Sequence, residues 1–270
     1  MEIKAIMCDV DGTLLNSQGV VTPKTIEAIR RVREAGILFG LCTGRDTHSV
    51  KTLLKPWGID GLVDAIVGNG GSEIYDLGLG VEKASHPLAG ELIAEIVHHY
   101  EDMEVNFAIP DEGILFAPKE DELIRFLAEV DGVPYKVCDY TEFLKAPKAK
   151  IMIVCDEAYM PKVIERSKTF QNDQYQSASL VTASVLYEYM DPRVSKANGL
   201  REWMELRNWD MSELCTFGDE DNDFDMTIAA GVGVVMENGS KKTRGVADYI
   251  TDDHDSDGIA TFIDQYILKA

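Results

Sequence analysis

The feature of this sequence that most restricts its fold is a regular alternation of short apolar runs with helix-like periods. The runs IKAIMC (3–8), ILFGLC (37–42) and DAIVG (64–68) have the length and composition of buried strands. The helix between the first two runs is predicted to begin at Pro23, in the favoured first position, and to end at Gly36. This β-α-β-α-β order favours a parallel sheet that is covered by helices on both faces.

The middle third of the chain follows a different pattern. After about Val81, closely spaced strand-like runs mix with helices, which indicates a mostly antiparallel α+β unit. The β-α rhythm resumes near Asp191. We therefore predict the α/β class: a Rossmann-like parallel-sheet core made of residues 1–83 and 189–270, with an α+β domain of residues 84–188 inserted into it.

The charge of the chain limits its partners. A formal net charge of −21 at pH 7 argues against nucleic acid and anionic membranes, because both require a basic surface. No apolar run approaches the roughly 20 residues that span a bilayer, and no signal-peptide pattern is present, so we expect a cytoplasmic protein. The five cysteines include no CxxC pair and are expected to be reduced and structural. The negative charge of the protein would repel an anionic substrate, so binding one would need a local cation, such as a bound metal ion.

Polar clusters occupy the ends of the core strands, where ligands bind in open parallel sheets. They are Asp9 and Asp11 after the first strand, Thr43, Gly44 and Arg45 after the second, Lys196 at the start of a later helix, and GDEDND (218–223) after ELCTF (213–217). Each cluster alone is explained by a turn, a strand end or a helix cap. Coincidence explains their consistent order along the chain much less well.

Phosphoryl transfer is the chemistry that these side chains fit. Mg²⁺ prefers oxygen ligands, so Asp9 and Asp219 are predicted to bind it, with Asp223 close by. The metal would let Asp9 approach a phosphate and attack phosphorus, which forms an aspartyl-phosphate. Residues two apart in a regular strand face the same side, so Asp11 is predicted to be the general acid and base for the same reacting group.

Three further groups would bind the phosphate itself. The turn at Gly12 would bring backbone N–H groups near it, and Thr43 would offer a hydroxyl. Lys196 would supply a compact positive charge to balance the charge on the phosphoryl oxygens. Each of these groups contributes positioning or electrostatic stabilisation.

At this point the sequence resembles the haloacid dehalogenase superfamily, and more narrowly its Cof-type branch of phosphatases with a large α+β cap (subfamily IIB, C2 cap). The similarity runs over nearly the whole chain. The segments that carry it are DVDGTLL (9–15), TGR (43–45), VSKANGL (194–200), GDEDNDFDM (218–226), AAGVGVVMENG (229–239), ADYIT (247–251) and DGIA (257–260).

The resemblance implies a role for several residues of these segments. Asp9 would be the nucleophile and a metal ligand, Asp11 the acid/base that also gives its backbone carbonyl to Mg²⁺, and Asp219 the other carboxylate ligand. The predicted substrate-binding residues are Gly12, Thr43, Gly44, Arg45, Lys196 and Asn222, and the predicted metal-binding residues are Asp9, Asp11, Asp219 and Asp223. The inserted domain would be a mobile cap that excludes water and selects the substrate.

Two departures from the family pattern leave the catalytic groups in place. Ala197 and Asn198 stand where a glycine and a small polar residue are expected, and NGG (69–71) replaces the commoner NGA. They concern the packing of the helix after Lys196 and whether Asn198 contacts the substrate.

The leading hypothesis is a Mg²⁺-dependent phosphatase, monomeric or homodimeric, that acts on a small phosphorylated metabolite. Sugar phosphates are favoured over flavin mononucleotide and pyridoxal phosphate. A phosphomutase would use similar residues but would yield an isomer instead of inorganic phosphate. A phosphoacceptor signalling module would gain nothing from Asp11 or from a cap, and a non-catalytic sugar-phosphate binder would not need Asp9, Asp11, Lys196 and Asp219 together.

Overall fold

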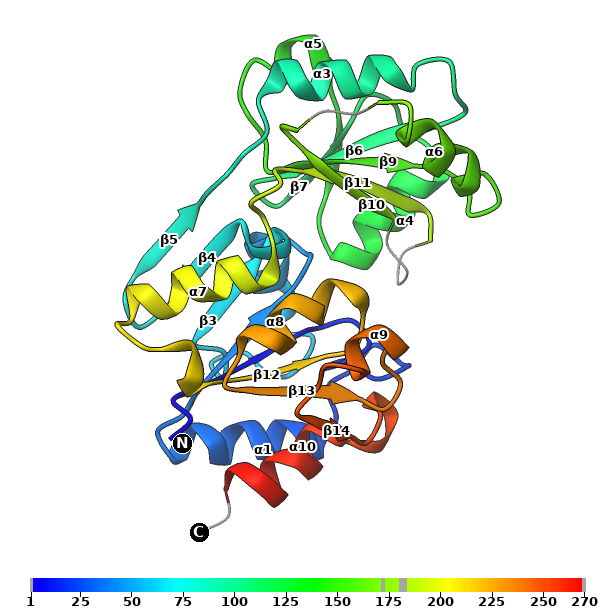
Figure 1. Cartoon of the computed structure of the whole chain (residues 1–270). Coiled ribbons are helices and arrows are strands. Elements are labelled where there is room, and N and C mark those ends of the chain that lie inside the picture. Colours follow the sequence, from blue (N-terminus) through cyan, green and yellow to red (C-terminus); the bar gives the residue numbers. More distant parts are fainter. Residues whose placement is uncertain (1, 171–172, 180–183, 269–270) are drawn as a thin grey trace. The chain divides into compact units, whose positions relative to one another are not determined.

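The computed structural model in Figure 1 describes residues 2–170, 173–179 and 184–268. The chain divides into two compact units: Met1–Lys83 with Ser195–Ala270, and Ala84–Val194. We call the first the core unit and the second the inserted unit. Among the described residues no helix has the length and apolar composition that crossing a bilayer requires.

The core unit contains an eight-stranded sheet with the strand order β14-β13-β12-β1-β2-β3-β4-β5. The strands are β1 (Ala5–Cys8), β2 (Leu38–Cys42), β3 (Ala65–Gly68), β4 (Glu73–Asp76), β5 (Val81–Ala84), β12 (Leu214–Gly218), β13 (Val232–Met236) and β14 (Tyr249–Thr251). From β14 to β3 all neighbours pair in parallel, whereas β4 runs antiparallel to β3. The parallel-sheet core predicted from the β-α rhythm is therefore confirmed.

Helices cover both faces of the core sheet, as Figure 1 shows. They are α1 (Pro23–Glu34), α2 (Thr47–Leu53), α7 (Lys196–Leu206), α8 (Phe224–Ala229), α9 (Lys241–Arg244) and α10 (Gly258–Phe262). Short 3₁₀ turns are η1 (Asn69–Gly71), η2 (Met211–Glu213), η3 (Asp221–Asp223) and η4 (His254–Ser256), and η5 (Ile263–Ile267) is a π-helical turn. One apolar cluster packs α1, α2 and α10 against one face, and a second packs α7 and α8 against the other. Burial on both faces explains why the strands read as continuous apolar runs.

The inserted unit is built on a six-stranded sheet with the order β10-β11-β9-β6-β7-β8. Its elements are α3 (Gly90–His99), β6 (Asn106–Asp111), β7 (Ile114–Ala117), α4 (Glu122–Asp131), β8 (Tyr135–Val137), α5 (Tyr140–Phe143), β9 (Lys150–Val154), α6 (Met160–Ser167), β10 (Gln176–Ser179) and β11 (Leu186–Met190). Its neighbouring strands pair in antiparallel fashion, apart from the parallel pair of β7 with β8. Separate apolar clusters lie on its two faces.

The inserted unit ends later than residue 188, the boundary that we predicted from the sequence. Position 188 falls inside β11 (Leu186–Met190), and the unit continues to Val194. Two hydrogen bonds attach this segment to the inserted unit: Gln176 Nε2 donates to the carbonyls of Asp191 (3.2 Å) and Val194 (2.5 Å). The core therefore resumes at Ser195, one residue before α7.

Candidate active site

The strands that precede the predicted site residues are neighbours in the core sheet. β1 lies between β12 and β2, and the three strands run parallel, so their carboxyl ends meet at one edge. Asp9, Thr43 and Asp219 directly follow these strands. Lys196 is the first residue of α7, and Asp223 ends the turn η3 that follows β12.

Three buried aspartates form the centre of this edge. Asp9, Asp219 and Asp223 are 6%, 3% and 0% exposed, and each offers an oxygen that lies within 4.8 Å of the others. Lys196 Nζ lies 2.6 Å from Asp9 Oδ1 and 2.5 Å from Asp223 Oδ1. We call these three aspartates the carboxylate cluster. Three formal negative charges face one positive charge, so the cluster carries a surplus that a divalent cation would neutralise.

Hydrogen bonds fix the orientation of the cluster. The second oxygen of Asp223 accepts the backbone N–H groups of Asp219 (2.8 Å) and Glu220 (3.0 Å). Thr13 Oγ1 donates to Asp219 Oδ1 over 2.6 Å. Gly12 has φ +85°, and a Cβ there would lie 2.4 Å from Asp219 Oδ2, so only glycine fits this position. The loop after β1 is thereby packed directly onto the end of β12.

Burial and surplus charge shift the pKa values of this cluster. Burial raises the pKa of Asp9 well above its ordinary value, and the other carboxylates add to the rise while Lys196 opposes it. Burial likewise raises the pKa of Asp219 to about 7, although the hydrogen bond from Thr13 lowers it in part. Burial alone would lower the pKa of Lys196, but Asp223 and Asp9 raise it well above its ordinary value. The lysine therefore stays charged, and the carboxylates compete for the single cation.

Asp11 lies outside the carboxylate cluster. Strand β1 ends at Cys8, so the argument that Asp9 and Asp11 share one face of a regular strand does not apply to this pair. The Asp11 side chain is 41% exposed and forms a two-pronged ion pair with Arg45, whose Nε and Nη2 lie 2.9 and 3.0 Å from its two oxygens. A guanidinium that was predicted to bind substrate thus holds the predicted acid/base in this structure.

The remaining predicted residues differ in burial. Thr43 is 1% exposed, and its hydroxyl accepts the backbone N–H of Arg45 at 3.2 Å. Gly44 is half-buried, and Asn222 is exposed on η3. The carbonyl of Gly12 accepts a hydrogen bond of 2.9 Å from Asn238 Nδ2. Thr43, Gly44 and Gly12 thus belong to the loops at this edge of the sheet, whereas Asn222 faces solvent.

Sequence reasoning missed several residues that build this edge. Thr13 and Asn238 hold the loop after β1, and a third contributor is the turn NGG, which the sequence showed only as a departure from the family pattern. Asn69 N and Gly70 N donate to the carbonyls of Arg45 (2.7 Å) and Thr43 (3.0 Å). Of these residues, Thr13 was the one that the sequence could have suggested. It directly follows DVDG at the end of a buried strand, and a hydroxyl that is buried there needs a hydrogen-bond partner.

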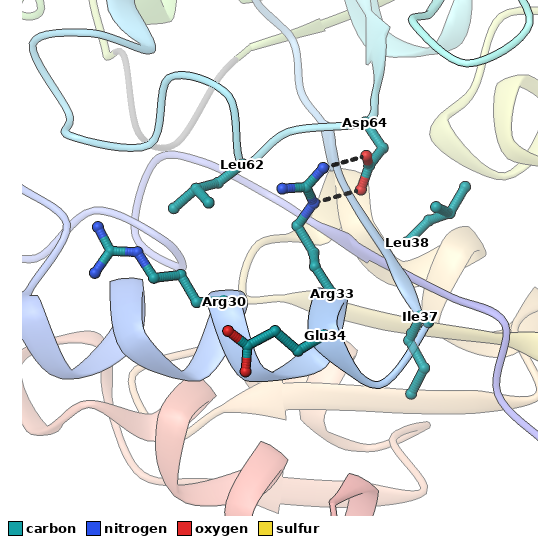
Figure 2. Close-up of a pocket in the computed structure, with 8 residues that line it drawn as sticks. Arg30, Arg33, Glu34, Ile37, Leu38, Leu62 and Asp64 are labelled. Carbon is teal, nitrogen blue, oxygen red and sulfur yellow. Dashed lines mark hydrogen bonds and ion pairs between the residues drawn. The ribbon is translucent and has the colours of Figure 1, made fainter.

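A pocket at the opposite edge of the core sheet has no part in this chemistry. Figure 2 shows its lining, which comes from the end of α1, the start of β2 and the segment before β3: Arg30, Arg33, Glu34, Gly36, Ile37, Leu38, Leu62 and Asp64. Arg33 lies 2.8 and 3.0 Å from the two oxygens of Asp64. Asp64 also accepts the N–H of Phe39 at 3.0 Å, so this ion pair fastens α1 to the sheet.

Comparison with known proteins places this geometry in context. A family model described as haloacid dehalogenase-like hydrolase matches residues 6–263. The 5-amino-6-(5-phospho-D-ribitylamino)uracil phosphatase YwtE of Bacillus subtilis is 26% identical, with 98% of each chain covered. The pyridoxal phosphate phosphatase YbhA of Escherichia coli is 24% identical, with 99% of this chain and 100% of that protein covered.

Solved structures agree with the fold. A haloacid dehalogenase-like hydrolase from Bacteroides thetaiotaomicron superposes with a TM-score of 0.87 at 24% identity, covering 98% of this chain and 99% of that one. The resemblance inferred from the sequence motifs is thereby confirmed at the level of family and fold.

Proposed function

The chain belongs to the haloacid dehalogenase-like hydrolase family and to its phosphatases, and from this premise we propose a Mg²⁺-dependent hydrolysis of small phosphomonoesters through an aspartyl-phosphate on Asp9. The observation that carries the proposal is the buried carboxylate cluster around Lys196 at the carboxyl ends of β1 and β12. Sugar phosphates are the substrate class that we propose first.

The donor set suits Mg²⁺. It consists of oxygen atoms alone, they converge within 4.8 Å, and they carry more negative charge than Lys196 can balance. Asp9 and Asp219 would hold the ion, with the Asp11 backbone carbonyl completing the protein ligands and Asp223 supporting them. When bound, Mg²⁺ supplies the positive charge that lets a carboxylate and a phosphate dianion approach each other.

The chain's own residues would then carry out two displacements at phosphorus. In the first, an oxygen of Asp9 attacks phosphorus and the ester P–O bond breaks. Asp11, which must leave its ion pair with Arg45 and carry a proton, protonates the departing alcohol oxygen. In the second, Asp11 removes a proton from water as the water oxygen attacks phosphorus, and the bond to Asp9 breaks. Lys196 and Thr43 would hold the phosphoryl oxygens during both displacements. Asp9 and Asp11 are regenerated, and inorganic phosphate leaves.

The position of Lys196 supports this proposed role. Its ammonium lies 2.6 Å from Asp9 Oδ1, so a phosphoryl group that is bonded to Asp9 would meet a fixed positive charge. The helix that carries Lys196 is capped by Ser195 Oγ, which accepts the N–H of Asn198 at 3.2 Å. The cap fixes the first turn of α7, and with it the start of the lysine side chain.

The relatives support small phosphorylated metabolites in general, whereas the preference for sugar phosphates comes from the sequence resemblance. Two of the relatives are named for phosphate esters of small metabolites, a ribitylamino-uracil and pyridoxal phosphate. A substrate panel should therefore contain sugar phosphates, the phosphorylated ribitylamino-uracil, flavin mononucleotide and pyridoxal phosphate. The oligomeric state, monomer or homodimer, and the cytoplasmic location stay predictions.

Release of inorganic phosphate from this panel tests the function. We expect turnover with Mg²⁺, none with a chelator, and recovery when Mg²⁺ is restored. A phosphomutase would instead convert one phosphorylated compound to its isomer without releasing phosphate, and a signalling module would retain a stable phosphoryl group on Asp9. Wild-type phosphate release by Asp9→Asn would exclude the proposed mechanism.

A further inference from the structure

The turn Asn69–Gly71 lies between two parts of the site that are distant in the sequence. On one side, its backbone N–H groups at 69 and 70 bind the carbonyls of Arg45 and Thr43. On the other side it approaches α7 so closely that a Cβ on Gly71 would lie 2.0 Å from the Ser195 carbonyl oxygen. Ser195 directly precedes Lys196 and caps its helix. The turn therefore contacts both the TGR loop and the start of α7.

One side chain, Glu73 at the start of β4, holds this turn in place. Its Oε1 accepts a hydrogen bond of 2.5 Å from Asn69 Nδ2. Its Oε2 accepts two more from Thr47, one from the backbone N–H and one from the hydroxyl, both of 2.8 Å. Thr47 begins α2, directly after the TGR loop and its cap residue. A single half-buried carboxylate thus ties β4, the turn and α2 together.

The carboxylate also decides the orientation of the Asn69 amide. A carboxylate can only accept hydrogen bonds, so the NH₂ group of Asn69 must face it. The amide oxygen then points away, and among the described residues it has no hydrogen-bond donor. Asn69 is 2% exposed and has φ +47°, a conformation that asparagine tolerates better than most residues. The unpartnered amide oxygen and the positive φ are both unfavourable, and they occur at a position that supports both the TGR loop and the start of α7.

We propose that Glu73 is a positioning residue for the phosphate-binding edge of the site. By holding Asn69 and Thr47 it keeps the TGR loop aligned with α7, and hence Thr43 and Arg45 aligned with Lys196. The inference rests on the proposed phosphatase function for its catalytic consequence, because only that function assigns phosphate binding to these residues. Glu73 itself takes no part in the chemistry.

Exchange of donor and acceptor tests this role. In Glu73→Gln two NH₂ groups face each other, or the Asn69 amide turns over and buries its NH₂ group where its oxygen now has no partner in the described part of the chain. In Asn69→Asp two carboxylates face each other. In the double variant Asn69→Asp/Glu73→Gln, the new amide donates to the new carboxylate, and an acceptor oxygen again occupies the place of the Asn69 amide oxygen. The double variant thus restores the pattern with its polarity reversed and with unchanged net charge.

The assay measures kcat/KM for p-nitrophenyl phosphate and for the best substrate of the panel, with full-length protein and Mg²⁺. We expect a loss of about tenfold for Glu73→Gln and a larger loss for Asn69→Asp, because small displacements of positioned groups are costly in catalysis. The double variant should return to within about threefold of wild type. A matched control is Glu82→Gln, which removes an exposed ion pair of 2.7 Å between β5 and Lys51 of α2 and should change nothing.

The binding of inorganic phosphate, followed by calorimetry, separates this inference from the proposed function. Weaker binding by Glu73→Gln, restored in the double variant, would support the positioning role even if the wild type cleaved no ester. Thermal melts identify any variant that fails to fold. The inference is overturned if Glu73→Gln matches Glu82→Gln in both turnover and phosphate binding, or if the double variant performs no better than Asn69→Asp.

Discussion

Two buried aspartate sites in the core unit have opposite electrostatic characters. Asp76, at the end of β4, is 0% exposed and is fully matched: Arg207 reaches both of its oxygens at 2.7 Å, and Trp203 Nε1 and Leu79 N donate at 2.7 and 2.8 Å. Burial alone would raise its pKa, but these bonds outweigh it and hold the pKa of Asp76 below its ordinary value. Asp219 is similarly buried, yet its pKa rises to about 7.

Burial raises the pKa at both sites, but hydrogen bonds and Arg207 outweigh it at Asp76, whereas at Asp219 burial prevails and the neighbouring Asp223 adds to it. Around Asp76 one guanidinium and two N–H groups satisfy one carboxylate, which is what a stabilising interaction requires. In the carboxylate cluster three acids share one ammonium, which is unfavourable for the folded protein unless a further cation binds. Satisfied buried charge therefore indicates structure, and surplus buried charge at strand ends indicates a functional site.

The strongest test of this comparison is removal of the nucleophile. We expect Asp9→Asn, and equally Asp11→Asn, to reduce phosphate release by at least about 10³-fold, because each removes a group that takes part in bond making or proton transfer. The melting temperature of Asp9→Asn should not fall, since the change removes surplus negative charge. The measurements are a phosphate-release assay and a circular-dichroism melt. A large loss of stability in Asp9→Asn would mean that this carboxylate is structural, like Asp76.

The converse change at the matched site should affect stability and leave chemistry intact. Asp76→Asn leaves Arg207, which is 14% exposed, without its counterion, and we expect a loss of roughly 2–4 kcal/mol in the free energy of unfolding. The kcat of the folded variant should stay within about twofold of wild type. Urea denaturation and steady-state kinetics check both statements. Unfolding at the wild-type urea concentration would show that the pair contributes little.

Metal addition distinguishes the two sites directly. Mg²⁺ at about 100 times its Kd should stabilise the wild-type protein by about 2.7 kcal/mol, because it binds the folded state alone. Asp219→Asn should lose most of this stabilisation, while Asp76→Asn should retain it relative to its own metal-free form. Thermal melts with chelator and with Mg²⁺ measure the shift. Equal shifts in the two variants would argue against a metal site at the carboxylate cluster.

The amino-acid sequence is enough to predict the position of the carboxylate cluster, but not its partners. Strands buried on both faces give continuous apolar runs, and parallel strands place their carboxyl ends together, so Asp9 and Asp219 can be assigned to one edge from the sequence alone. The extension of the sheet by β4 and β5 was not foreseen, because these strands are partly exposed and contain charged residues in place of a continuous apolar run. With β4 came Asp76 and Glu73, whose significance depends on that sheet position.

Pairing between side chains that are distant in the sequence was the other feature that could not be predicted. Asp76 and Arg207 are 131 positions apart, and no local pattern links them. Arg45 was assigned to substrate because TGR follows a strand, yet its guanidinium pairs with Asp11, since the chain leaves the strand geometry after Cys8. The roles predicted for the site residues stay predictions, and the variants above are their test.

The smallest expected effect is a difference in pH dependence, measured with chelator present. An acid whose pKa rises to about 7 on folding keeps its proton where the unfolded chain has lost it. The contribution of Asp219 to stability is therefore complete below about pH 4 and is lost as the pH rises to about 7. Asp76, with a lowered pKa, behaves oppositely: its contribution is present above about pH 4 and is lost as the pH falls through the lowered value.

Urea unfolding between about pH 5 and 8 distinguishes the contribution of Asp219 to stability from that of Asp76. The wild-type free energy should decrease by on the order of 1 kcal/mol over this range, because folded Asp219 keeps a proton that the unfolded chain has lost. Asp219→Asn should reduce this slope, to which Asp9 also contributes, whereas Asp76→Asn should keep it in full, so that the difference between variants cancels all other titrating groups. Mg²⁺ must displace the same proton from Asp219, so the affinity of the wild type for Mg²⁺ should also fall below about pH 7. An identical pH slope of stability in Asp219→Asn and Asp76→Asn would contradict the surplus-charge interpretation.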